Sequence, residues 1–177
     1  LEYLPSLRAA ARSGDRDVRL LALKTLGDAE WKYYFGDVGS APDLPSDMAT
    51  ILDGPCPFWP DQLVRDTHLL VLIPATVGGV PFTLNLLGEL VQRPSNGGHR
   101  TAYGYYHERV KTQIGEHSPP RSYWLLMTRD VLPGSRSVGY AHQKELVKAS
   151  VPYELPSVLE AATAILMHHA REGERLF

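Results

Sequence analysis

Two apolar runs dominate the pattern of hydrophobic and polar positions along the chain. Residues Thr67–Ile73 are almost continuously apolar and end at Pro74, and residues Ser122–Thr128 form a second run of similar length. A short apolar run that stops at a helix breaker is typical of a strand buried on both faces. We therefore predict that these runs are the main strands of a small mixed or antiparallel sheet. The predicted core around them consists of Leu70, Leu72, Leu87, Leu90, Trp124, Leu126, Ile165 and Leu166.

Helix signals flank the predicted strands. The clearest helix begins at a capping box, because Ser157 is followed three positions later by Glu160, and it ends before Gly173. Further helices are predicted over residues 86–92, with Asn85 as the cap, over residues 140–149, and in a short stretch ending at Gly115. The predicted fold class is therefore α+β, a small sheet flanked by helices.

The N-terminal segment predicts a helical hairpin. Val18, Leu21, Ala22 and Leu26 have the spacing of one helix face, and Asp15 or Asp17 can cap that helix. Residues 12–27 resemble one unit of a HEAT-type helical repeat. One unit cannot bury its own apolar face, and such arrays need about three or more units. Two interpretations stay open: a hairpin packed on the main domain, or the stub of a longer repeat array.

Prolines divide the chain into three predicted parts. Residues 6–41 contain none, whereas residues 42–60 contain five. Proline fixes φ and lacks a backbone donor, so this second stretch is predicted to be an extended connector with one short helix near residues 47–52, capped by Ser46. The predicted organisation is a hairpin over residues 1–41, a connector over residues 42–66 and an α+β domain over residues 67–177.

Composition and charge exclude several classes of protein. The formal net charge of −2 lacks the basic surplus of a dedicated nucleic-acid binder, so no nucleic-acid partner is expected. No apolar run approaches the ~18 residues that a transmembrane helix needs. The single cysteine, Cys56, excludes an internal disulfide framework and any zinc site with paired thiolates. Composition thus predicts a soluble domain without a metal or cofactor.

The cellular location is only weakly constrained by the sequence. A lone cysteine and the absence of an Asn-x-Ser/Thr site slightly favour the cytoplasm. A secreted effector or a surface-displayed protein remains an alternative. The first residue is Leu1 and not Met, which leaves open that the chain is a fragment.

Cys56 and His68 form the sharpest catalytic hypothesis. A nucleophilic thiol needs a nearby imidazole that holds it as thiolate, and a polar group such as Asp53 or Asn85 that orients the imidazole. However, Cys56 lies between Pro55 and Pro57, away from any helix N-terminus that would lower its pKa. The other interpretation is that Cys56 is a small buried hydrophobic residue.

Aromatic residues give the candidate binding surface. Residues 101–106 are rich in tyrosine and are predicted to form a strand, on which Tyr103 and Tyr105 share one face and Tyr106 takes the other. Tyr123 lies at the start of the second apolar run. Tyrosine is favoured at recognition surfaces because it offers a large contact area at low entropic cost. Core packing is the alternative role for these four tyrosines.

Several longer segments carry a family resemblance. The segments are Trp31–Gly39, Gly54–Pro60, Thr67–Pro74, Leu84–Val91, Ser122–Arg136 and Gly173–Phe177. Together they resemble an uncharacterised module of environmental chlamydiae and other amoeba-associated bacteria, over roughly residues 15–177.

The order of predicted elements is also similar to C-type-lectin-like binding domains, including variable display proteins. In those domains a strand and a helix lead to an extended Leu-Pro step and a second helix. Here residues 124–128, 140–149, 154–156 and 157–171 would take these places. The resemblance implies a scaffold for ligand display. It carries over no binding residue, because the ligand-bearing part of those domains would follow Phe177.

The leading functional hypothesis is a non-catalytic module that binds a protein or a small ligand. The aromatic segments and the absence of catalytic motifs such as GxSxG, HExxH and GxxxxGK[ST] favour it. The first alternative is a thiol hydrolase that uses Cys56 and His68. The second is an adaptor domain attached to a helical-repeat array. An enzyme is thus the less favoured class.

Overall fold

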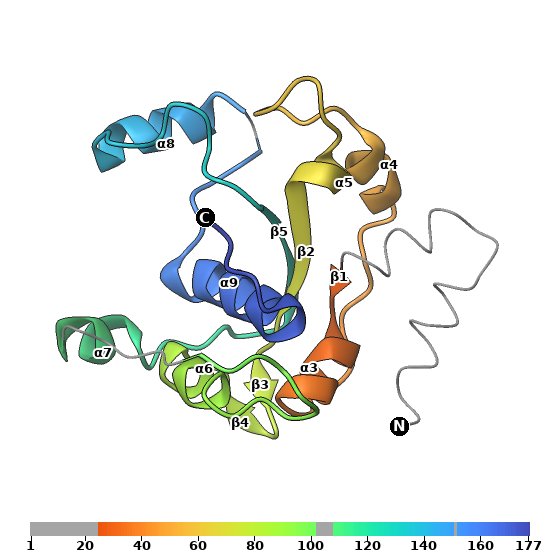
Figure 1. Ribbon diagram of the computed structural model, residues 1–177, viewed down its shortest axis with the longest axis vertical. Helices are drawn as coiled ribbons and strands as arrows, with labels where there is room; N and C mark the ends of the chain where they lie inside the picture. Colours follow the sequence, from red (N-terminus) through yellow and green to blue (C-terminus); the bar gives the residue numbers. More distant parts are fainter. Residues whose placement is uncertain (1–24, 102–107, 151) are drawn as a thin grey trace.

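The computed structural model describes residues 25–101, 108–150 and 152–177 (Figure 1). Within them the fold is α+β, as predicted. Its strands are β1 (Thr25–Leu26), β2 (His68–Ile73), β3 (Thr76–Val77), β4 (Val80–Pro81) and β5 (Tyr123–Thr128). Its helices are α3 (Asp28–Tyr34), α4 (Met48–Asp53), α5 (Val64–Thr67), α6 (Leu84–Leu90), α7 (Glu108–Ile114), α8 (Tyr140–Lys148) and α9 (Val158–Glu172).

The main sheet is mixed and has the order β1-β2-β5. The central strand β2 pairs in parallel with β1 and antiparallel with β5, so that His68 lies opposite Thr128 and Ile73 opposite Tyr123. Every residue of β2 is buried. Both apolar runs are therefore strands, and the first is buried on both faces, as its continuous apolar pattern predicts. The short strands β3 and β4 form a separate hairpin.

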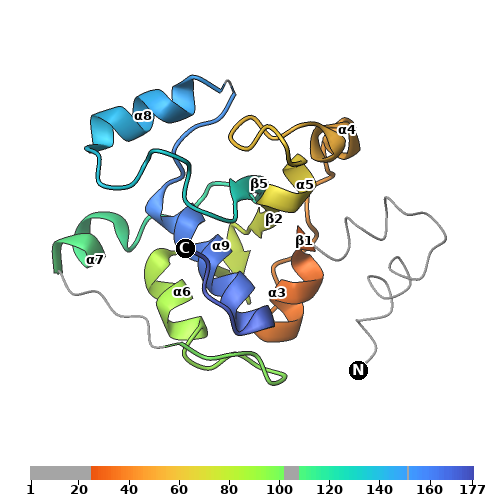
Figure 2. The same ribbon diagram turned by 45° about the horizontal axis from the view of Figure 1, so that its top comes forward.

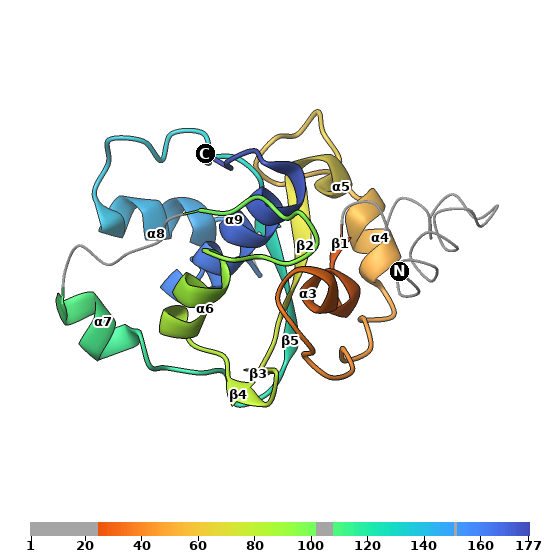
Figure 3. The same cartoon turned by 60° about the horizontal axis from the view of Figure 1, so that its bottom comes forward.

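The two faces of the main sheet are covered by different parts of the chain. Tyr123 reaches Glu160 on α9, whereas the next side chain, Trp124, takes the opposite face and donates to the carbonyl of Pro42. Figures 1 and 3 show α9 and α4 on opposite sides of the sheet. The connector thus packs on one face and places Met48, Cys56 and Val64 in the interior.

Three of the eight predicted core residues are buried, and the other five are partly buried. Leu70, Leu72 and Leu87 are buried. Leu126 is half-buried, and the other predicted members lie partly buried against the main core cluster. These other members are Leu90, Trp124, Ile165 and Leu166.

The cap of α9 is the one predicted, but two other caps are not. Ser157 Oγ accepts a hydrogen bond from the Glu160 backbone N–H, and the Glu160 carboxylate accepts from the Ser157 N–H, which completes the capping box. Asn85 is not the cap of α6. Thr83 holds that place, because its backbone is extended and its hydroxyl accepts from the Leu86 N–H at 3.1 Å. Similarly, α4 begins at Met48, so that Asp47 and not Ser46 stands at its N-cap.

The predicted N-terminal hairpin lies mostly on residues 1–24, outside the described residues. Its last apolar position, Leu26, is described and lies in β1, fully buried. Gly27 follows as the N-cap of α3, and its N–H donates to Glu30 Oε2 at 2.8 Å. The predicted boundaries at residues 41 and 66 stay predictions.

Two helices are weakly packed. Among the described residues, α7 buries no side chain and α8 buries only Val147. Figure 2 shows both helices standing away from the sheet. Within the described parts of the chain, no helix has the length and apolar character needed to cross a membrane.

Candidate functional site

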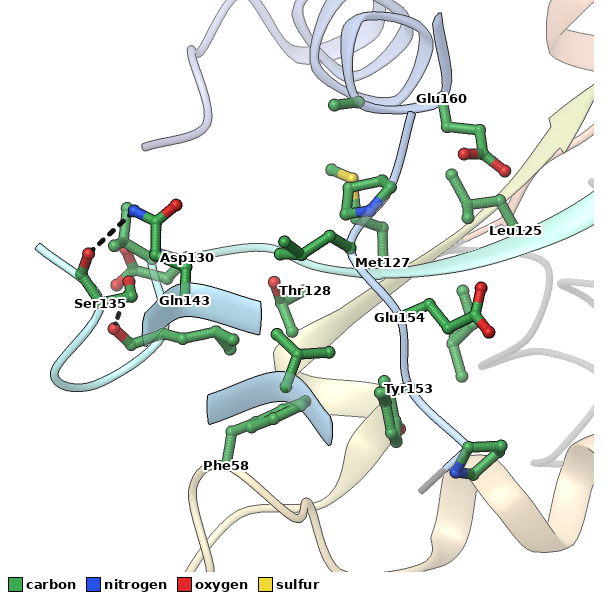
Figure 4. A pocket seen from close by; sticks show the side chains of 18 of the residues that line it. Phe58, Leu125, Met127, Thr128, Asp130, Ser135, Gln143, Tyr153, Glu154 and Glu160 are labelled. Carbon is green, nitrogen blue, oxygen red and sulfur yellow. Dashed lines mark hydrogen bonds between the residues drawn. The ribbon is translucent and has the colours of Figure 1, made fainter. Parts of the chain in front are cut away.

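A groove of about 710 Å³ lies beside β5 and is the site that we consider. Its volume is within the range of about 300–1,000 Å³ that is common for ligand sites. Figure 4 shows Leu125 and Met127 of β5 on the side of Glu160, and Thr128 on the opposite side, toward Phe58 and Tyr153. Most of the lining is apolar, with a few polar groups, which is typical of a site that binds an apolar ligand in one orientation.

The groove follows the outer edge of β5. Four consecutive residues, 125–128, line it, although their side chains alternate between the two faces of the sheet. Its lining also includes Ala161 of α9 on one face and Met48 and Ile51 of α4 on the other. A groove with walls from both faces of the sheet has to run along the strand's edge.

The hydrogen-bond register shows which backbone groups of β5 point away from β2, toward the free edge of the sheet. Arg129 N–H donates to the Thr67 carbonyl, directly opposite, at 2.8 Å. In an antiparallel pair, hydrogen-bonded and non-hydrogen-bonded positions alternate. The N–H and C=O groups of residues 123, 125 and 127 therefore pair with β2, and those of Trp124, Leu126 and Thr128 point away from it. No backbone group of the described residues pairs with these outward groups.

The outer wall of the groove consists of α8 and the extended segment 152–156. Val147 of α8 packs inward, and Gln143 Nε2 donates to the Ser135 carbonyl at 3.1 Å (Figure 4). Tyr153 and Leu155 add apolar surface from the segment. This wall forms no backbone ladder with β5 in the described residues, so the edge of β5 stays open toward the groove.

The polar groups of the groove are acidic. Asp130, Glu154 and Glu160 line it, and none of its lining residues is a lysine, arginine or histidine. Asp130 and Glu154 are exposed, and within the described residues neither forms an ion pair. The groove therefore offers negative charge that no lining residue compensates.

Tyr123 lies at the start of β5 and is not one of the residues that line the groove. Its hydroxyl donates to Glu160 Oε1 at 2.9 Å. Burial raises the pKa of Tyr123, and the hydrogen bond to the carboxylate raises it further. Burial would also raise the pKa of Glu160, but hydrogen bonds from Ser157 and Tyr123 outweigh it and hold that pKa below its usual value. Glu160 is thus an ionised carboxylate, fixed in place.

Cys56 and His68 are both buried, and His68 belongs to an aromatic cluster with Phe58 and Tyr153. Each is 2% exposed. The His68 ring stacks on Phe58, with centroids 6.4 Å apart, and lies 5.6 Å from the Tyr153 ring. Burial raises the pKa of Tyr153, and the electrostatic influence of Cys56 raises it further. Phe58 and Tyr153 line the groove, but Cys56 and His68 do not.

Among the described residues, His68 is hydrogen-bonded through one ring nitrogen. Its Nδ1 lies 2.9 Å from Thr67 Oγ1, and the same hydroxyl is within hydrogen-bond distance of the carbonyls of Leu63 and Val64. Nε2 is buried without a hydrogen-bond partner in the described residues. Burial lowers the pKa of His68 to about 4. Within the same residues, no hydrogen bond joins the imidazole to the thiol.

Three of the four candidate tyrosines, Tyr103, Tyr105 and Tyr106, lie outside the described residues. The structure therefore places only Tyr123 relative to the groove. Within residues 25–101, 108–150 and 152–177, no three histidine, cysteine or acidic side chains come together as a metal site.

The groove itself was missed by sequence analysis. Its lining comes from segments between residues 48 and 177 that share no local pattern. One signal was present: Asp130 follows the end of a predicted strand, a frequent place for functional groups.

No protein family, curated protein or solved structure matches this chain. The resemblance to the chlamydial module and to C-type-lectin-like domains therefore stays a prediction.

Proposed function

We propose that the chain is a non-catalytic binding module and that the groove along β5 is its ligand site. The observation that carries this proposal is the groove's construction: an apolar lining of about 710 Å³ beside a strand edge that no described backbone covers. Burial of apolar ligand surface there supplies the binding free energy, roughly 25 cal/mol per Å².

The position of the aromatic cluster also supports a binding role. A thiol nucleophile has to reach its substrate, but Cys56 lies in the interior and does not line the groove. His68 is likewise buried. The groove offers an accessible apolar surface. Phe58 and Tyr153 line it and also pack in the aromatic cluster with His68.

Binding of the uncharged apolar dye N-phenyl-1-naphthylamine tests the proposal. The dye becomes fluorescent when it leaves water for an apolar site. Thr128→Phe places a phenyl ring in the groove and should lower dye affinity at least tenfold. The matched control is Val158→Phe, because Val158 lines a separate groove on α9. Absence of dye binding, or equal affinities in both variants, would overturn the proposal.

A further inference from the structure

We infer that the natural occupant of the groove is an extended peptide that adds a strand to the free edge of β5 and carries a basic side chain. This inference rests on the proposed function and specifies its ligand. It combines two independent features of the groove, the unpaired backbone groups and the uncompensated acidic charge.

Alternate residues of β5 carry backbone groups that can pair with an added strand. Trp124, Leu126 and Thr128 direct their N–H and C=O groups away from β2, and the described residues give them no backbone partner. An unpaired edge strand is a template for another strand. A peptide chain carries donors and acceptors at the same repeat, so it can satisfy the whole row at once.

The dimensions agree with a short peptide. The six residues of β5 span about 20 Å at roughly 3.3 Å per residue. The strand is held along its whole length by the buried strand β2, so its edge is fixed before binding. A fixed edge lowers the entropic cost of association.

The side chains of the groove specify the kind of peptide. An added strand directs alternate side chains to opposite faces of the sheet. The groove has apolar lining residues on both of these faces. Met127 lies on the α9 face, and Leu126 lies with Ile51 on the α4 face. We therefore expect apolar residues at successive positions of the bound peptide.

The acidic charge of the groove favours a peptide that carries a basic residue. Asp130 follows the end of β5, and Glu154 lies on the opposite wall. Neither has a cationic partner within the described residues. A lysine or arginine near the peptide end that faces Asp130 would supply the missing positive charge, and would make binding dependent on salt concentration.

The experiment begins with selection of binders from random peptides displayed on phage. A selected peptide is then synthesised with one backbone amide methylated at a time. In a strand pair only every second amide of the peptide donates to β5. Methylation should therefore weaken binding more than tenfold at alternate positions and leave the intervening positions within about threefold.

Substitutions in the protein test the free backbone groups of β5 and the acidic charge of the groove separately. Leu126→Pro removes an N–H that β2 does not use, and proline is tolerated on the free side of an edge strand. It should abolish peptide binding, whereas the control Leu126→Ala retains the N–H and should weaken binding only severalfold. Asp130→Asn combined with Glu154→Gln should lower affinity for the basic peptide about tenfold and reduce its salt dependence.

The outcomes separate this inference from the proposed function. If N-phenyl-1-naphthylamine binds the groove but no peptide is selected, or if methylation shows no alternation, the peptide inference is overturned and the ligand site stands. If a peptide binds equally well to the Thr128→Phe protein, its site lies elsewhere and the inference is likewise overturned. If the dye also fails to bind, both proposals fall.

Discussion

The Tyr123 hydroxyl donates a hydrogen bond to Glu160 Oε1 at 2.9 Å and thereby ties the first residue of β5 to the first turn of α9. The same carboxylate accepts from the Ser157 N–H through its other oxygen, Oε2. Glu160 thus serves both as the capping partner of the helix and as an anchor for the strand that borders the groove.

Tyr123→Phe should destabilise the fold by about 1–2 kcal/mol, because it removes one hydrogen bond to a charged group but leaves Glu160 with its capping partner. Chemical denaturation measures the change in the free energy of unfolding. Tyr140→Phe is the control, since Tyr140 is 67% exposed, and it should have no measurable effect. Equal stability of both variants would contradict the anchoring role.

Local patterns account for the elements that the sequence predicted correctly. The first apolar run became a fully buried strand, and Ser157, Glu160 and Gly173 marked α9 at both ends. Each of these signals depends on neighbours a few positions away. The cap of α6 was misplaced because Thr83 and Asn85 are both acceptable caps, and only the tertiary position of Asn85, whose amide donates to Glu116, removes it from that role.

Non-local packing accounts for what the sequence did not predict. Leu26 has the spacing of a helix face, but its pairing with Val71 places it in the main sheet. The groove likewise arises because α4, β5, α8 and α9, far apart in the sequence, border one strand edge. Such an arrangement leaves no period or motif in the chain, so tertiary structure is needed to find it.

Gly173→Ala should be more destabilising than an ordinary substitution at a left-handed position. Gly173 has a φ of +77°, and an added Cβ would lie 2.9 Å from the His99 ring. Gly134 has a φ of +76° with no atom within 4 Å of such a Cβ. We therefore expect a cost of about 1–2 kcal/mol for Gly134→Ala, from backbone strain alone.

The loss of unfolding free energy for Gly173→Ala should exceed the loss for Gly134→Ala by about 1 kcal/mol or more, because overpacking adds to the backbone strain. Urea unfolding of the two variants measures the difference. Identical losses would mean that the His99 ring moves aside freely.

Stability should fall in acid because His68 is buried as the neutral imidazole. Its pKa is about 4 in the folded protein and 6.5 ordinarily, so the unfolded state binds the proton more readily. The stabilisation is fully present above pH 6.5 and is lost as the pH falls through about 4, a difference of about 3 kcal/mol.

The control is His68→Phe, which keeps an aromatic ring between Phe58 and Tyr153 but cannot titrate. Unfolding free energies at several pH values should show a shallower decline for this variant than for the original chain. Parallel curves for the two proteins would contradict the assignment of this pH dependence to His68.

Cys56 should react slowly with iodoacetamide in the native state. The thiol is 2% exposed and no described histidine forms a hydrogen bond with it. Cys56→Ser should cost about 1 kcal/mol or more, because it buries a hydroxyl without an evident partner, and should leave dye binding intact. Rapid alkylation at neutral pH that is lost only in acid, where the thiolate of a Cys56–His68 pair takes up a proton, would favour the thiol hydrolase instead.

Residue-resolved hydrogen exchange of the unliganded protein shows whether the edge of β5 is free. The amides of Tyr123, Leu125 and Met127 pair with β2 and should exchange slowly. The amides of Trp124, Leu126 and Thr128 point away from β2 and should exchange at least a hundredfold faster, which gives an alternating pattern along the strand. Slow exchange at all six positions would show that the edge is already covered and would contradict the account.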